Sequence, residues 1–99
     1  MSGSDIALID GVPELCSQCS APLCVRKQVI NLALGNTDTM QCLKCLARQS
    51  DNTDAGVLTG ISDYIRSREC FFKEWRRYRS VEDCPDREGC VPRQCFPAT

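Results

Sequence analysis

Apolar residues recur at helical spacing in three segments of this chain. Between residues 22 and 34 they fall three and four positions apart, and Gly35-Asn36 follows as a usual helix stop signal. A shorter segment covers 40–48, and the longest covers 57–79. The longest segment carries a stripe that consists of Ile61, Tyr64, Ile65, Arg68, Phe72, Trp75 and Tyr78. Because such a stripe is typical of a helix that faces a core, the pattern predicts three helices, at 22–34, 40–48 and 57–79.

The rest of the chain lacks a helical pattern. We expect residues 1–14 to form an N-terminal arm and residues 15–99 to form a single metal-stabilised domain. After Ser80 the sequence is irregular and contains prolines, so an ordered segment there needs a covalent or metal tie. The predicted class is a small cysteine-rich domain, mainly α-helical with irregular Cys-rich segments. Residues 30–34 also alternate as in a strand, which leaves a zinc-ribbon-like α+β fold as the alternative.

Cysteine dominates the composition. Nine of the 99 residues are Cys and none is His, and the apolar fraction of 42% includes those cysteines. The remaining apolar residues make a modest core for a chain of this length. The absence of His excludes Cys2His2 fingers, Rieske centres and catalysis by an imidazole base. No P-loop, GxGxxG, GxSxG or HExxH motif is present, and we therefore expect no enzymatic activity.

Two CxxC pairs form the strongest motif in the chain. Cys16 and Cys19 make the first pair, and Cys42 and Cys45 make the second. Each pair can hold a metal ion from one turn, and two pairs complete the closed four-thiolate shell of structural zinc. The separation of the pairs slightly exceeds the usual ribbon spacing of about 15–20 residues. We expect these four cysteines to share one zinc ion.

A second metal site is expected to hold the C-terminal segment to the longest helix. Cys70 lies on that helix about 180° away from its apolar stripe, so it is not placed to fill the core. We group Cys70 with the three cysteines that follow it, Cys84, Cys90 and Cys95. Cys24 is the remaining cysteine and is an alternative ligand. The sequence thus predicts one or two zinc ions.

An iron–sulfur cluster is the main alternative to zinc, because it also takes cysteine thiolates and tolerates irregular spacing. Cys16, Cys19 and Cys24 with one distant cysteine could hold a [4Fe–4S] cluster, and a [2Fe–2S] cluster is a further option. The cysteine order of bacterial and plant-type ferredoxins is absent, which favours zinc. A redox-active CxxC belongs to a βαβ unit, and no such pattern is present.

Charge and the N-terminal sequence bear on partners and location. The net charge of −1 argues against general binding of polyanions. Residues 73–79 hold four basic side chains beside Tyr78, so a nucleic-acid-binding zinc module remains an alternative. No signal peptide or membrane-spanning segment is recognised, and we expect no membrane partner and a reducing, cytoplasmic location.

These observations predict a non-catalytic zinc-binding accessory or regulatory protein that binds a macromolecular partner, which we expect to be a protein. The alternative is an iron–sulfur protein that acts in electron transfer or as a subunit of a redox complex.

Overall fold

The computed structural model describes residues 8–79, 81–84 and 95. This part of the chain forms four α-helices and a short 3-10 helix: α1 (Val25–Ala33), α2 (Leu43–Gln49), α3 (Asp54–Ser67), α4 (Glu69–Trp75) and η1 (Val81–Asp83). Between the described residues the only β pairing is an isolated bridge that joins Leu15 and Pro22. The mainly helical, cysteine-rich class is confirmed, and the α+β alternative finds no strand in the described residues.

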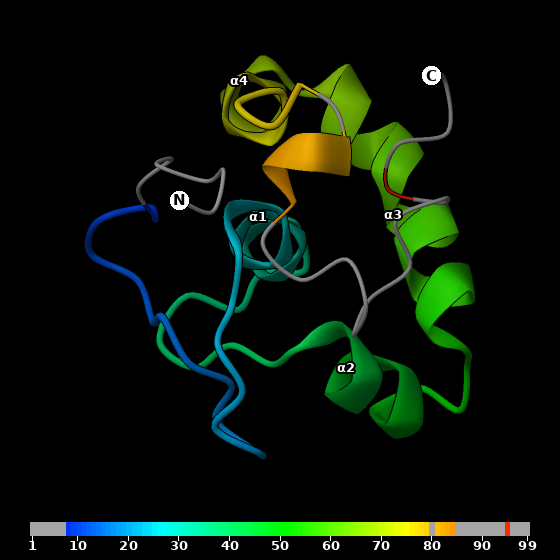
Figure 1. Ribbon diagram of the computed structural model, residues 1–99. Helices are drawn as coiled ribbons and strands as arrows, with labels where there is room; N and C mark the ends of the chain where they lie inside the picture. Colours follow the sequence, from blue (N-terminus) through cyan, green and yellow to red (C-terminus); the bar gives the residue numbers. More distant parts are fainter. Residues whose placement is uncertain (1–7, 80, 85–94, 96–99) are drawn as a thin grey trace.

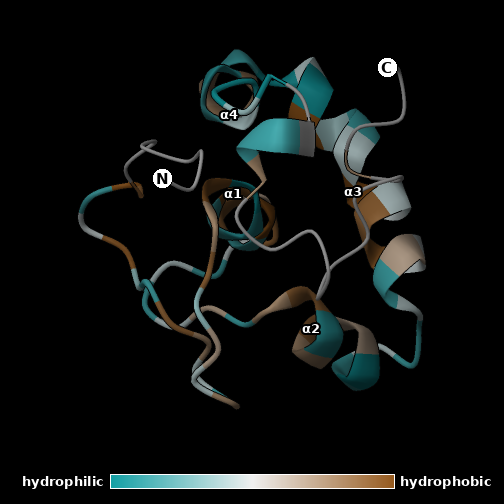
Figure 2. Cartoon of the chain, in the orientation of Figure 1, coloured by the Kyte–Doolittle hydropathy of each residue, from teal (hydrophilic) through white to brown (hydrophobic). Residues whose placement is uncertain are grey.

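Helix α1 lies in the middle of the molecule; in the view of Figure 1, α4 lies above it, α3 to its right and α2 below it, and loops lie on the remaining side. Helix α1 carries both hydrophobic and hydrophilic residues, whereas the visible turns of α4 are mostly hydrophilic (Figure 2). The main core joins α1 to all the other helices, and its buried members are Cys24, Val25, Val29, Ile30, Leu43, Leu46, Leu58, Ile65, Trp75, Tyr78 and Cys95. Helix α1 contacts α3 and α4 directly, and α2 joins the same core through Leu43 and Leu46.

The predicted single helix over 57–79 is wrong, because the structure divides this segment into α3 and α4. Arg68 separates them with extended backbone, at φ −117° and ψ 115°. A straight helix over 57–79 would be roughly 34 Å long at the usual rise per residue, but the molecule extends only 31 Å along its longest axis. The break at Arg68 folds α4 back, so that Ile65 and Trp75 are buried in the same core.

The two shorter helices were predicted correctly but begin later than expected. Cys24 and Cys42 occupy the N-cap positions of α1 and α2, both with extended backbone. The residues that precede each cap belong to loops that carry cysteines. The segments 22–24 and 40–42 are therefore loop rather than helix.

The described part of the predicted N-terminal arm, residues 8–14, packs against α1. Leu8 and Ile9 are half-buried on the main core. None of the described helices is both long enough and apolar enough to cross a lipid bilayer.

Candidate metal centre

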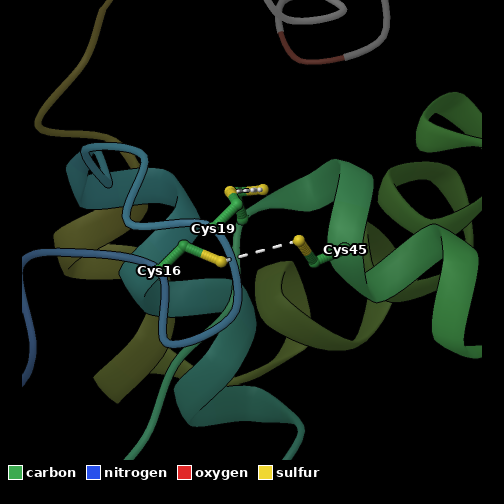
Figure 3. A group of neighbouring side chains, drawn as sticks. Cys16, Cys19 and Cys45 are labelled. Atoms are coloured by element: carbon green, nitrogen blue, oxygen red, sulfur yellow. Dashed lines mark hydrogen bonds between the residues drawn. The ribbon is translucent and has the colours of Figure 1, made fainter.

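Four cysteine sulfurs meet where the loop at 16–21 packs against the start of α2. The Sγ atoms of Cys16, Cys19, Cys42 and Cys45 all lie within 4.8 Å of one another. Cys16 Sγ lies 3.6 Å from Cys45 Sγ, and Figure 3 shows these two side chains pointing toward each other. Cys19 Sγ lies 3.7 Å from Cys42 Sγ. The structure thus brings the two predicted CxxC pairs together in a group that could hold a metal ion.

A tight turn positions the first pair. The Ser20 N–H donates to the Cys16 carbonyl (2.9 Å), and the Cys16 N–H donates to the Ala21 carbonyl (2.8 Å). Ser20 adopts a φ of 64°, in the left-handed region that glycine occupies most easily. The Gln18 N–H also donates to Cys16 Sγ at 3.4 Å. The turn therefore presents Cys16 and Cys19 to the same point without a glycine after the second cysteine.

The start of α2 positions the second pair. Cys42 is the N-cap residue, and Cys45 lies three positions later in the first turn, a spacing that places both side chains on one side of the helix. Leu43 and Leu46 of the same helix are buried in the main core. Because those two side chains fix the rotation of α2, the sulfur-bearing side faces the loop at 16–21.

The buried amide of Asn31 holds the chain directly before Cys42. Asn31 is 0% exposed, and its Oδ1 accepts from the Gln41 N–H (2.9 Å) while its Nδ2 donates to the Gln41 carbonyl (2.9 Å). The same Nδ2 donates to the Lys27 carbonyl of α1 at 2.7 Å. One side chain of the central helix thus satisfies both backbone groups of the residue next to a ligand.

The buried amide of Gln28 likewise holds the backbone of the segment that leads to Cys16. Gln28 is also 0% exposed; its Oε1 accepts from the Ile9 N–H (2.9 Å), and its Nε2 donates to the Pro13 carbonyl (2.9 Å). Neither amide was predicted from the sequence, because polar residues within a helix are usually assigned to its solvent face. One sequence signal could have identified them: Gln28 and Asn31 lie three positions apart in a helix, and the loops at both ends of that helix carry cysteines.

A small apolar cluster surrounds the sulfurs on the protein side. Leu23 and Met40 are buried against Cys16, Cys42 and Cys45. Cys19 is the exposed member of the four. Three of the four sulfurs are therefore shielded from water, which strengthens their interaction with any bound cation.

The electrostatics of the four thiols favour binding of a cation. Burial opposes ionisation of Cys16, but hydrogen bonds from the backbone, those of Cys42 and Cys19 first, lower its pKa to about 6. Burial and then the neighbouring sulfurs, Cys42 first, raise the pKa of Cys45 to about 12. The surroundings thus favour the thiolate form of Cys16 and the thiol form of Cys45. A divalent cation would offset the burial and the repulsion that raise the pKa of Cys45, because the thiolate is the form that binds metal.

The other predicted ligands are distributed over two places. Cys70 is exposed on α4. Cys24 and Cys95 are buried in the main core, and the half-buried Cys84 packs against it. Cys90 lies outside the described residues, so the grouping of Cys70 with Cys84, Cys90 and Cys95 stays a prediction.

The basic segment at 73–79 is partly neutralised and carries no exposed aromatic ring. Arg77 Nη1 lies 2.9 Å from Glu74 Oε1, and Arg76 Nη2 lies 3.5 Å from Glu69 Oε2. Tyr78 is 2% exposed. A buried ring cannot stack on a nucleobase, so the geometry does not favour the nucleic-acid alternative.

Comparison with known proteins gives no significant match to any protein-family model, curated protein or solved structure. The four-cysteine centre therefore carries the functional inference.

Proposed function

We propose that this protein is a non-catalytic, zinc-binding accessory or regulatory protein of the cytoplasm. Its metal centre holds the cysteine loops and the helices in one rigid shape, and this shape binds a partner protein.

The observation that carries the proposal is the spacing of the sulfurs. In a tetrahedron with Zn–S bonds of about 2.3 Å, neighbouring sulfurs lie about 3.8 Å apart. The Sγ atoms of Cys16 and Cys45 are 3.6 Å apart and those of Cys19 and Cys42 are 3.7 Å apart, both close to that value. A four-iron cluster places a separate iron beside each cysteine with sulfides between them, so it needs wider spacing. The close spacing supports a single ion, and zinc is the usual ion in a closed four-thiolate shell.

The donor set supports a structural rather than a catalytic role. Four thiolates fill a tetrahedral shell and leave no open position for water or substrate. The same ion would connect the loop at 16–21 to α2. Cys19 in the loop and Cys42 at the start of α2 are 23 positions apart in the sequence. Because such a site does not exist in the unfolded chain, its binding free energy, on the order of 10 kcal/mol, contributes directly to folding. Thiolates of this kind persist in a reducing compartment, which supports the cytoplasmic location.

An apolar groove supports a protein partner. A hollow of about 410 Å³ lies between the end of α1, α2 and α3, and its lining includes Leu34, Val57 and Ile61. Leu34 is 47% exposed at this groove. A partner that covers the groove would remove this apolar surface from water, which favours association.

The test of the metal centre is metal analysis of anaerobically purified protein. We expect a colourless protein that contains zinc, and we expect Cys16→Ser and Cys42→Ser each to lose that ion and to unfold at a lower denaturant concentration. Cys70→Ser, at an exposed cysteine, is the matched control and should keep the ion. A brown protein that contains iron, or zinc retained at the wild-type level in both ligand variants, would contradict the proposal.

The partner is tested separately by affinity purification from an extract of the source cells. A protein retained by the wild type and lost by Leu34→Glu, with unchanged zinc content, is the expected result. Retention of the same proteins by both forms would place the interaction elsewhere than the groove.

A further inference from the structure

The apolar groove between the end of α1, α2 and α3 has a lining that restricts what can bind there. Helices α2 and α3 lie side by side (Figure 1), and the segment at 50–53 joins them. Among the described residues that line the groove, none is charged and none is aromatic, and the apolar ones include Leu34, Val57 and Ile61. Gly60 also lines it, and a Cβ added there would meet no atom within 4 Å. A bound apolar side chain can therefore approach the backbone of α3 closely.

The backbone around the groove favours a helical occupant. A peptide that binds by strand addition needs a free sheet edge, and the described residues offer only the isolated bridge of Leu15 and Pro22. A polyproline segment docks in a groove lined by aromatic side chains, which the described lining lacks. A helix satisfies its own backbone hydrogen bonds and needs only an apolar surface for one of its faces. Of these peptide-recognition modes, binding of a helix in the groove is the one that remains.

The loops that frame the groove carry negative charge. Asp51 is exposed, and both of its neighbours in the sequence line the groove. Asp38 is exposed two positions after the lining residue Asn36. Helix α1 ends at the groove with Leu34 as its C-cap and has no basic residue in its last turn. The partial negative charge of that helix end is therefore not balanced within the turn.

The basic side chains that are nearest in the sequence belong to a different part of the surface. Lys44 and Arg48 line a separate hollow beside the cysteine centre, together with Cys19 and Lys27. At the start of α3, Asp54 in the first turn offsets the partial positive charge of that helix end. The groove thus combines an apolar lining with a negative rim, and such a rim attracts Lys and Arg side chains.

We propose that the apolar groove binds an amphipathic helix of a partner protein, with Lys or Arg beside the apolar stripe of that helix; this specifies the partner in the proposed function and rests on it. The apolar stripe covers Leu34, Val57 and Ile61, and the basic side chains lie near Asp51 and Asp38. Removal of the apolar lining from water favours association. The opposite charges speed the encounter and select against acidic helices.

Selection from a displayed library of random peptides tests this proposal. The peptides are about 18 residues long, which allows roughly five helical turns. The full wild-type chain is the bait, Leu34→Glu is used for counter-selection, and the zinc content of both is measured. We expect the enriched peptides to carry apolar residues three and four positions apart with Lys or Arg beside them. If Leu34→Glu fails to fold, Gly60→Glu takes its place, because it adds a charged side chain in open space on α3.

One enriched peptide is then titrated against each variant by fluorescence anisotropy. We expect Leu34→Glu to weaken binding by at least about tenfold. Asp51→Asn should weaken binding roughly two- to fivefold and reduce its salt dependence; Asn has the same size and tolerates the left-handed φ of 56° at this position. Glu69→Gln is the matched control and should bind like the wild type, because Glu69 is exposed on α4, which supplies none of the described lining residues.

Several outcomes would overturn the basic helix as the occupant. Acidic or proline-rich peptides that depend on Leu34 would keep the groove as a protein-binding site but contradict the helix and its charge. Enrichment of no peptide, or equal binding by the wild type and Leu34→Glu, would remove the groove as a docking site. Equal effects of Asp51→Asn and Glu69→Gln would contradict the role of the negative rim. All of these leave the metal centre intact in a wild type that contains zinc, whereas a zinc-free wild type that selects basic helices would contradict the metal centre alone.

Discussion

Replacement of Asn31 by alanine tests whether the central helix positions the metal ligands. The amide of Asn31 is the partner of both the N–H and the carbonyl of Gln41, the residue before Cys42. Asn31→Ala removes that amide and leaves both Gln41 groups without it. The side chain is 0% exposed, so water cannot simply take its place without some local rearrangement.

The magnitude follows from the number of groups that lose a partner. Each buried polar group without a hydrogen bond costs about 1–3 kcal/mol. Gln41 is half-buried, so water relieves part of the cost at its backbone. Two such groups, each at the lower half of this range, give an expected loss of about 2–4 kcal/mol in the free energy of unfolding. Asn36→Ala is the matched control, because Asn36 is half-buried and donates a single long bond of 3.3 Å to Asn31. Its expected cost is below about 1 kcal/mol.

The assay has two parts. Denaturant unfolding at saturating zinc gives the stability of each variant, and competition with a chromophoric chelator under native conditions gives its zinc affinity. If Asn31 positions Cys42, the Asn31→Ala variant loses stability and also binds zinc more weakly than Asn36→Ala does. Equal stability of the two variants would contradict a stabilising role of the buried Asn31 amide. A loss of stability with unchanged zinc affinity would refute its connection to the ligand.

Two further predictions concern α3. Thr53→Ala should lower the free energy of unfolding by about 1 kcal/mol, because the Thr53 hydroxyl oxygen accepts from the Gly56 N–H (2.9 Å) at the start of the helix. Thr59→Ala, at an exposed position within α3, is the control. Equal effects of the two substitutions would contradict a capping role of Thr53. Gly60→Ala should raise the free energy of unfolding by about 0.5–1 kcal/mol, because Gly60 is exposed within α3 and an added Cβ meets no atom within 4 Å. Denaturant titration at saturating zinc measures both, and a destabilised Gly60→Ala would show that the groove beside it closes more tightly than the structure indicates.

The sequence predicted the four-cysteine group because that group depends on local spacing. A CxxC pair places two sulfurs on one turn whatever surrounds it, and only the meeting of the two turns requires the fold. The break at Arg68 could not be predicted in the same way. No proline or glycine marks it, and the apolar stripe continues through it. The chain bends there because α4 must return to the core that α3 already covers, and that requirement comes from tertiary packing.

The roles of Gln28 and Asn31 were missed for a related reason. Within α1 the pattern of apolar residues identifies the helix but assumes that its polar residues face water. In the structure Arg26, Lys27, Gln28 and Asn31 are all buried. A helix at the centre of a small domain has no solvent face over most of its length, so its polar side chains must find partners inside the protein.

Those partners link the candidate metal centre to the fold. Loop backbone groups that are buried need hydrogen bonds, and the described residues contain no sheet to provide them. In this protein the side chains of α1 provide them instead: Gln28 for the segment before Cys16, Asn31 for the residue before Cys42, and Arg26 for the carbonyls of Tyr78 and Cys95. Each of these loops also carries or adjoins a cysteine. A metal ion bound at the proposed centre would hold the loops of Cys16 and Cys42 where Gln28 and Asn31 reach them, and these two side chains in turn hold the cysteines close enough to share an ion. Loss of either the ion or the amides would therefore weaken the other.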